Sequence, residues 1–245
     1  MRILKFSLIV LLLAGLTATA QTKRVAPFTK VIVSPYIQVT FVEGDEESVT
    51  VDDIKVDENK LHIEVNQQTL RLYLDGAKDI PKYEKDYSSG HKESHPLYEN
   101  SSVVATVTYR KLTALSLRGA ETHLCKSPIN ASVFSLTLYG ESGITFNELK
   151  AQEMETTIYG EATLNIKAGA VQEQKYTCYG EGHVNTLAIR GNTSRIIAFG
   201  DADLRINVSD RIKITAYGDA KLHYKGDPEI VKGVHLGDMQ INRID

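Results

Sequence analysis

One short motif recurs about every twenty residues through the C-terminal half of this 245-residue chain. The motif reads aromatic residue, Gly, acid, small residue, any residue, aliphatic residue. Its clear copies begin at Tyr139, Tyr159, Tyr179, Phe199 and Tyr217, and a degenerate copy begins at Leu236. From Gly119 to Gly237, successive glycines are 21, 20, 20, 20, 18 and 19 residues apart. A nearly constant period of this length predicts a solenoid in which each repeat forms one coil.

The residues that precede each glycine alternate with a period of two, which is the period of a β-strand. Two residues before the glycines stand small or aliphatic side chains: Leu117, Leu138, Ile158, Cys178, Ala198 and Ala216. One residue before the glycines stand the aromatics, and three residues before them stands mostly Thr. We therefore expect the aliphatic set to point inward and the aromatic and Thr sets to point outward. Four residues after the glycines the chain is expected to return to the core with Ile144, Leu164, Val184, Leu204, Leu222 and Ile241.

The glycines are expected at the bends between strands, where a positive φ or the close approach of the next coil excludes a Cβ atom. A β-sandwich would show hairpin turns and no constant period. The sequence therefore predicts an all-β fold, a single-stranded right-handed parallel β-helix (β-solenoid) with about 20 residues per coil.

The first twenty residues have the pattern of a secretory signal peptide, with Arg2 and Lys5 at the start of an apolar run that closes on Ala18-Thr19-Ala20. We expect residues 1–20 to be removed and residues 21–245 to form a single β-helix domain. Residues 21–114 are expected to be N-terminal β layers or a cap, with a polar insertion at 77–102, and residues 115–245 to be the regular coils.

Charge and hydropathy limit the class of partner. The net charge is −3, and Lys and Arg alternate with acids through the repeats, so no basic face for nucleic acid is expected. The mature chain is expected to hold no transmembrane segment and to be exported to the periplasm, the outer-membrane surface or the medium. A homo-oligomer stays open, because the end of a solenoid exposes unpaired backbone groups.

Three segments resemble a known family: residues 28–31 (Phe-Thr-Lys-Val), residues 39–51 around Glu43-Gly44-Asp45-Glu46, and the lead-in to the coils at 112–119. On these segments the chain resembles the putative auto-transporter adhesin, head GIN domain family, which is common among exported proteins of Bacteroidetes. The resemblance implies a right-handed β-helix, an exported location and, from the name of the family, adhesion. It brings no catalytic residues, and the 77–102 insertion has no counterpart in the family pattern.

The aromatic column comprises Tyr139, Tyr159, Tyr179, Phe199 and Tyr217, and one strand spacing of about 4.8 Å is expected between its rings. Two interpretations are open. The rings stack on one another and shield the strands, as cross-strand aromatic pairs do. Alternatively, they form an outward surface that binds sugar rings, with the Thr and acid columns supplying hydrogen bonds to hydroxyl groups.

The acid column comprises Glu141, Glu161, Glu181, Asp201 and Asp219, with Asp238 in the degenerate copy. Like charges one rung apart repel by about 1 kcal/mol per pair even in water, so something should offset the repulsion. The favoured hypothesis is that these carboxylates accept backbone N–H bonds at the bend. The alternatives are bound calcium, which takes carboxylate oxygens, and solvated side chains that splay apart.

No constellation for catalysis or for a dedicated metal site stands out. Glycoside hydrolysis needs two carboxylates in different environments, whereas an evenly repeated column gives no such asymmetry. We therefore expect no enzyme and no cofactor. The sequence favours an exported binding protein that recognises carbohydrate or a cell-envelope component through a repetitive Thr, Tyr and acid face. The alternatives are a structural or self-assembling envelope protein without a ligand and, more weakly, a polysaccharide lyase or hydrolase.

Overall fold

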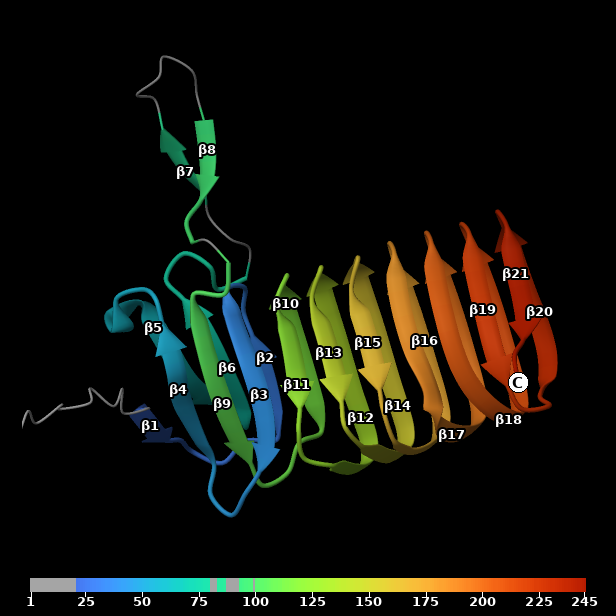
Figure 1. The fold of residues 1–245 in the computed structure, drawn as a ribbon, viewed down its shortest axis with the longest axis horizontal. Coiled ribbons are helices and arrows are strands. Elements are labelled where there is room, and N and C mark those ends of the chain that lie inside the picture. The colour runs from blue at the N-terminus through green and yellow to red at the C-terminus, as the bar shows by residue number, and fades with distance from the viewer. Residues whose placement is uncertain (1–20, 80–82, 87–92, 99) are drawn as a thin grey trace, which may run out of the picture.

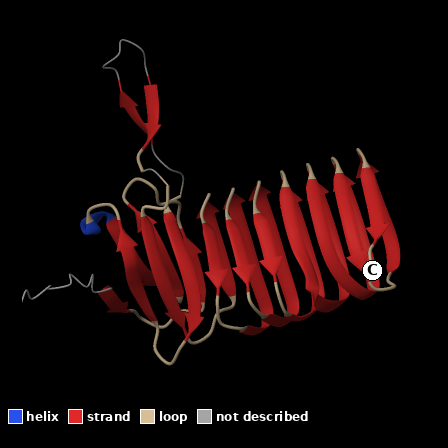
Figure 2. Ribbon diagram, viewed as in Figure 1, coloured by secondary structure: helices blue, strands red, loops and turns tan. Residues whose placement is uncertain are grey.

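The computed structural model describes residues 21–79, 83–86, 93–98 and 100–245, so the predicted signal peptide lies outside the described part. The described residues form an elongated solenoid whose strands run across its long axis (Figure 1). Nearly every described element is a strand, and the one helical element among them is a single 3-10 turn, η1 (Glu58–Lys60) (Figure 2). None of the described residues belongs to a helix long and apolar enough to cross a membrane. The predicted β-solenoid with coils about 20 residues apart is confirmed, and its right hand stays a prediction.

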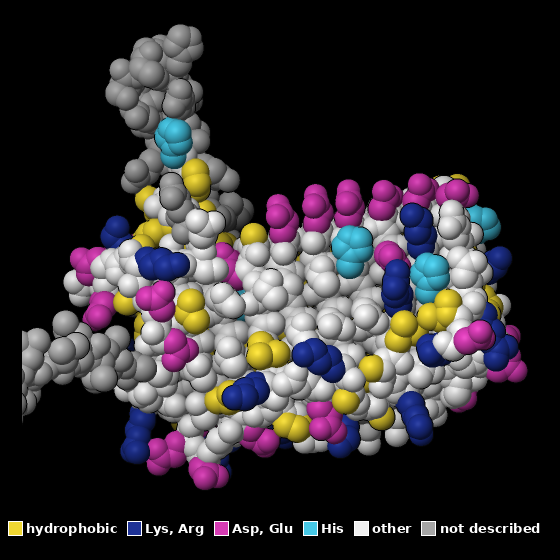
Figure 3. Space-filling view, in the orientation of Figure 1, with side chains coloured by type: hydrophobic (Ala, Val, Ile, Leu, Met, Phe, Trp, Pro, Cys, Tyr) yellow, Lys and Arg dark blue, Asp and Glu magenta, His cyan; other side chains and the backbone are white. Residues whose placement is uncertain are grey.

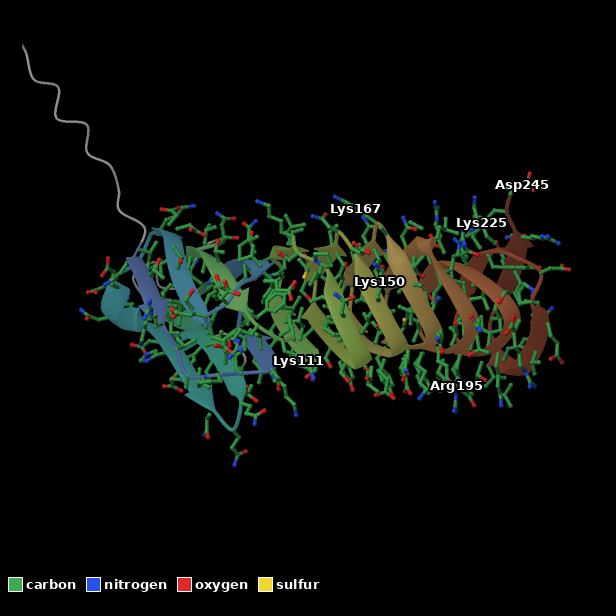
Figure 4. The ribbon with its side chains drawn as sticks, turned by 90° about the horizontal axis from the view of Figure 1, so that it is seen from below. Lys111, Lys150, Lys167, Arg195, Lys225 and Asp245 are labelled. Carbon is green, nitrogen blue, oxygen red and sulfur yellow. The ribbon has the colours of Figure 1, made fainter. Side chains whose placement is uncertain are left out.

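Two layers of strands build the regular coils. The layer that leads into the glycine bends comprises β10 (Ala114–Gly119), β12 (Ile129–Gly140), β14 (Leu149–Gly160), β16 (Gly169–Tyr179), the second halves of β17 (Gly182–Phe199) and β18 (Ala202–Tyr217), and β20 (Glu229–Leu236). The layer that follows the bends comprises β11 (Thr122–Cys125), β13 (Gly143–Phe146), β15 (Thr163–Ile166), the first halves of β17 and β18, β19 (Ala220–Lys225) and β21 (Met239–Arg243). We call the outer surface of the first layer the aromatic face and that of the second layer the opposite face. Figure 4 separates them, because Arg195 projects from the aromatic face, Lys167 and Lys225 project from the opposite face, and Lys150 lies on the underside between them.

Neighbouring strands of the regular coils are parallel and in register with the repeat. Tyr139 pairs with Tyr159, and Tyr159 pairs with Tyr179. The predicted inward column is confirmed, since all six of its members are buried: Leu117, Leu138, Ile158, Cys178, Ala198 and Ala216. The residues four places after the glycines are buried as predicted from Ile144 to Leu222, and Ile241 in the last coil packs partly buried against the core. The core is therefore a continuous apolar column along the solenoid axis.

The bend explains why the repeat needs glycine. Gly160 has a φ of 110°, and a Cβ atom there would lie 2.6 Å from the carbonyl oxygen of Gly140 in the preceding coil. Both the positive φ and the contact exclude other residues. The same stacking recurs at the other glycines of the motif, so the predicted placement of the bend is confirmed.

The strands of the N-terminal layers are stacked in an order that differs from their order along the sequence. β2 (Lys30–Val33) and β3 (Ile37–Glu43) form a coil that lies between β10–β11 on one side and β6 (Thr69–Leu74) with β9 (Val103–Tyr109) on the other, all in parallel. Antiparallel strands then close this end of the solenoid. These are β4 (Ser48–Ile54) on β9, β5 (Leu61–Asn66) on β6, and β1 (Gln21–Arg24) on β4.

The described part of the 77–102 insertion includes an antiparallel hairpin of β7 (Tyr83–Asp86) and β8 (Glu93–Pro96), which projects away from the solenoid (Figure 1). Tyr98 fixes the return of the chain to the core. Its ring is buried and meets the Tyr36 ring edge-on at 5.5 Å, and its hydroxyl donates to the Asp75 carbonyl oxygen at 2.9 Å.

Candidate functional site

The predicted aromatic column forms a continuous ladder on the aromatic face. Ring centroids of successive members lie 5.0–5.1 Å apart, and the ring planes are within 2–10° of parallel: Tyr139, Tyr159, Tyr179, Phe199 and Tyr217. From Tyr159 onward the side chains point outward and remain 39–41% exposed. The strands place them so because each aromatic stands one residue after an inward side chain.

The ring faces of the ladder are turned toward one another. Two coplanar rings with centroids 5.0 Å apart would collide, because non-bonded carbon atoms need about 3.5–4.0 Å. The rings are therefore stacked along the solenoid axis, which was the first of the two interpretations of the sequence. Ring edges and phenol hydroxyl groups face the solvent, so a flat sugar ring has no free aromatic face to stack on within the ladder.

A salt-bridged arginine covers the first ring of the ladder. The Arg118 guanidinium lies 5.0 Å from the Tyr139 ring centroid, in the register position one coil earlier. Its Nη1 donates to the Asp79 carboxylate at 2.6 Å, and Arg71 donates to the same oxygen at 2.5 Å. Hydrogen bonds and charge from Arg71, then Arg118, hold the pKa of Asp79 below its usual range. Arg118 is thus fixed over the ring face by a cation–π contact.

Beside the ladder runs a column of half-buried Thr side chains at Thr137, Thr157, Thr177 and Thr215, with Ile197 interrupting it. Within the described residues, no hydrogen bond from another part of the chain reaches these Thr hydroxyls or the ladder hydroxyls. The next column along the strands is charged, and there Lys175 pairs with Glu153 and, at 3.3 Å, with Glu155. The face therefore offers two rows of unpaired hydroxyl groups bordered by charges.

The predicted acid column lies along the glycine bends and is exposed: Glu141, Glu161, Glu181, Asp201 and Asp219. Figure 3 shows acidic side chains projecting in a row along this edge of the solenoid. The hypothesis of backbone N–H bonds to these carboxylates is confirmed only at Asp219, which accepts from the Asp238 amide at 2.9 Å. It is wrong for the rest of the column, because bend amides such as those of Glu141 and Glu161 donate instead to the glycine carbonyls of the preceding coil. These other side chains are solvated.

Geometry for a metal ion is missing from the part of the chain that the structure describes. No group of three or more His, Cys, Asp or Glu side chains there converges in the way that a metal site needs. The carboxylates of the acid column lie in one straight row along an edge of the solenoid, whereas calcium takes six to eight oxygen ligands arranged around one point.

Sequence reasoning missed a buried polar pair at the start of the regular coils. Glu121 and His123 occupy the inward positions that later coils fill with small and aliphatic residues, and both are buried. The His123 Nδ1 accepts from the Val39 amide at 3.2 Å, and burial lowers the pKa of His123 to about 3. Burial raises the pKa of Glu121, whose carboxylate accepts from the Ala120 amide at 3.1 Å. The available signal was the break in the repeat at Gly119, where Ala120 replaces the acid.

A shallow hollow of about 310 Å³ lies on the opposite face, where three coils present polar side chains side by side. Its polar lining residues are Thr163, Asn165, His183, Asn185, Asp203 and Arg205. Asp203 Oδ1 is inaccessible to solvent and lacks a hydrogen bond, and its ion pair with Arg205 Nε spans 3.9 Å.

Comparison with known structures supports the fold. A crystal structure of a putative adhesin from Bacteroides fragilis has 17% sequence identity and a TM-score of 0.74, with 92% of this chain and 96% of that chain covered. A putative adhesin from Parabacteroides merdae has 18% identity and a TM-score of 0.66, with 93% and 96% covered. A putative lipid binding protein from Parabacteroides distasonis has 16% identity and a TM-score of 0.55, with 92% and 96% covered. At these identities the likeness shows the fold alone.

No curated protein matches the sequence. A family profile does match, and it covers residues 27–228, which include the N-terminal layers, the aromatic ladder and most of the regular coils. The chain therefore belongs to the family described as putative auto-transporter adhesin, head GIN domain.

Proposed function

We propose that this protein is an exported, non-enzymatic binding protein that recognises an extended carbohydrate of the cell envelope or a cell surface through its aromatic face. The observation that carries the proposal is the pair of hydroxyl columns. The Tyr ladder and the Thr column run in register, interrupted together in one coil by Ile197 and Phe199, and none of their hydroxyls is used by another described part of the chain.

Membership of an adhesin family supports a binding role rather than catalysis. The arrangement of carboxylates also supports it, because the acids along the bends share one solvated environment. General acid and general base roles need carboxyl groups whose environments differ. The same family supports an exported or surface location.

The ring geometry defines how such a ligand would be held. Because ring faces are occupied by neighbouring rings, contact would come from ring edges, phenol hydroxyls and Thr hydroxyls. One rung offers few such contacts, and a polar contact on an exposed surface contributes little by itself. A ligand that runs along the solenoid axis would gather the contacts of several coils, so binding should increase with the length of the polymer.

The experiment is a glycan-array screen of residues 21–245, followed by titration of each hit with oligomers of increasing length. The Tyr159→Phe, Tyr179→Phe pair removes two hydroxyls and keeps the stack, whereas Tyr159→Ala, Tyr179→Ala removes both rings. We expect the first pair to weaken binding and the second to abolish it. Each titration is run with calcium and with chelator, which tests whether the acid column takes part.

The matched control is His183→Ala, Asn185→Ala, which alters two polar side chains of β17 on the opposite face, directly after the bend that follows Tyr179. Binding that survives this change and is lost in the Tyr variants supports the proposal. Loss only in the opposite-face variant would move the site to the hollow there. Absence of binding to every glycan, or binding to lipid vesicles alone, would overturn the carbohydrate proposal.

A further inference from the structure

The coil formed by β20 and β21 has neighbours on one side only. Among the described residues, β20 pairs with β18 and β21 pairs with β19, so the outer backbone groups of both strands are unpaired. Val234 and Leu236 beside this edge are 61% and 65% exposed. An open parallel edge next to apolar side chains is a template on which another chain can add a strand.

The inward positions of this coil break the pattern of the coil before it. In that preceding coil the inward residues are all apolar: Ile212, Ile214, Ala216, Ala220, Leu222 and Tyr224. Their register partners in the last coil are Ile230, Lys232, His235, Met239, Ile241 and Arg243. Basic residues thus replace three of the six apolar side chains.

These three basic residues have little compensation within the protein. Arg243 pairs with the Asp227 carboxylate at 3.0 Å, and Asp227 is 90% exposed. Lys232 and His235 form no ion pair or hydrogen bond with other described residues. The pairing of β18 with β20 also shifts register between Ile214 and Ala216, at Gly233 and Val234. Inward charges and a bulge are both devices that keep an edge strand from pairing.

We propose that the coil of β20 and β21 is a charged cap that prevents a second copy of this chain from stacking on the open end of the solenoid. Two copies meeting end to end would place Lys232 and Arg243 of both in one shared interior. Charges of one sign would then lose water without gaining a partner, and the mutual repulsion adds to that cost.

The opposite end of the solenoid carries a charge of the same sign at an inward position. On β1, the outermost strand there, Lys23 stands opposite Val49, whose side chain is fully buried in the core. A head-to-tail contact that keeps the two layers continuous would place β1 of one copy on β21 of the other, and would therefore bring Lys23 toward Arg243 rather than toward an acid. Like charges at the two ends disfavour filaments as well as two-fold dimers.

The test restores the residues that stand one coil earlier. The variant Lys232→Ile, His235→Ala, Arg243→Tyr gives the last coil the interior of the preceding one. Sedimentation velocity over a concentration series should show the unaltered protein as a monomer and the variant associating about tenfold or more tightly. Each single substitution should shift the equilibrium in the same direction, which keeps the test valid if the triple variant folds poorly.

Two controls locate the effect. The variant Lys213→Ile, Lys221→Ala, Arg205→Tyr removes basic residues from outward positions of the neighbouring strands and should stay monomeric. Adding Ile241→Lys to the associating variant returns a charge to another inward position and should restore the monomer. The proposal would be overturned if the variant Lys232→Ile, His235→Ala, Arg243→Tyr stayed monomeric, or if the variant with the outward substitutions associated equally well. It would also be overturned if the unaltered protein already dimerised through this end.

Discussion

The regular coils and the N-terminal layers have the same stacked geometry, and they reach it from opposite kinds of sequence. In the coils each strand pairs with a strand about one repeat away, as Thr157 pairs with Thr177. In the N-terminal layers β2 pairs with β10, and Val31 meets Leu115 across 84 residues of chain. A periodic sequence thus indicates that coils are stacked in the order in which they occur along the chain. Stacking by itself does not need this periodicity, because it requires only that apolar side chains point inward and polar ones outward in each strand.

The difference extends to the residues inside the solenoid. At the two inward positions just after the bend, the later coils carry small or aliphatic residues, and the first coil departs from this with Glu121 and His123. That departure lies where the coils meet β3, whose Val39 amide donates to His123. The junction between the two regions is therefore specified by a polar contact, and the repeats are specified by packing and by glycine bends.

The largest expected effect concerns the bends. Gly160→Val should lower the free energy of unfolding by about 3 kcal/mol or more, because Val would adopt a φ of 110° and press on the Gly140 carbonyl. Chemical denaturation measures the loss. The control is Gly143→Ala, where the nearest atom to a new Cβ is the Thr122 hydroxyl at 3.5 Å and little change is expected. Equal losses in both variants would remove the special role of the bend.

The next effect tests the junction. Burial depresses the pKa of His123 to about 3 in the folded protein, whereas the pKa of a histidine in the unfolded chain is about 6.5. Above about pH 6.5 the ring is neutral in both states, and there the free energy of unfolding is not reduced by this residue. Stability should fall as the pH drops from about 6.5 toward 3, by roughly 1.4 kcal/mol per pH unit from this residue. Burial raises the pKa of Glu121, so this acid opposes the trend at the acidic end of the range.

The variant His123→Leu places at the junction a side chain like those of the later coils. Its unfolding free energy should depend less on pH between 6.5 and 5 than that of the unaltered protein. Parallel pH profiles for the two proteins would show that His123 titrates normally and is not the buried neutral group described above.

A smaller effect is expected in the aromatic ladder. Tyr179→Ala removes two ring contacts and should cost about 1–2 kcal/mol of stability, since an aromatic pair contributes about 0.5–1.5 kcal/mol beyond its burial. Tyr179→Phe should cost almost nothing, because the hydroxyl has no partner among the described residues. Thermal melting compares the two variants. Losses of similar size would show that the hydroxyl, rather than the stacked ring, stabilises the ladder.

The smallest effect distinguishes members of the acid column. Asp219→Ala should lose about 0.5–1 kcal/mol, because the Asp238 amide loses its acceptor. Glu181→Ala should be neutral or slightly stabilising at low salt, since it relieves repulsion from its neighbours and breaks no hydrogen bond within the described chain. Denaturation at two ionic strengths checks both, and a larger loss at Glu181 would reveal a partner for that carboxylate.

The repeat made much of this structure predictable. Leu138 and Ile158 are inward and Tyr159 is outward, as the alternation indicated, and the glycines lie at the bends. These features depend on neighbours one coil away, which carry the same motif in the sequence. The stacking of the rings also follows from identical side chains in register, although the sequence left their exposure and orientation open.

Features that join distant segments were not predictable in this way. The Arg118 contact with Asp79 spans 39 residues and depends on where the chain returns after β6. The order of β2, β6 and β10 in the layers leaves no periodic trace, because each of these strands meets a partner with a different sequence. The pairing of basic residues of the last coil with the inward column was also not predictable, since the bulge at Gly233 shifts which residues of β20 stand opposite the inward residues of β18.

The most direct test of the solenoid register is whether outward residues one repeat apart are nearest neighbours, because the ladder, the proposed site and the cap all depend on this register. Thr157→Cys, Thr177→Cys places two cysteines opposite one another with their Cα atoms about 4.8 Å apart, within the Cα range for a disulfide. The pair Thr157→Cys, Lys175→Cys is offset by two residues, at about 7–8 Å or more. Burial raises the pKa values of Cys125 and Cys178 to about 12, which keeps them out of the reaction. Mild oxidation should bridge the first pair almost completely and the second hardly at all, whereas equal bridging, or bridging of the offset pair alone, would contradict the register.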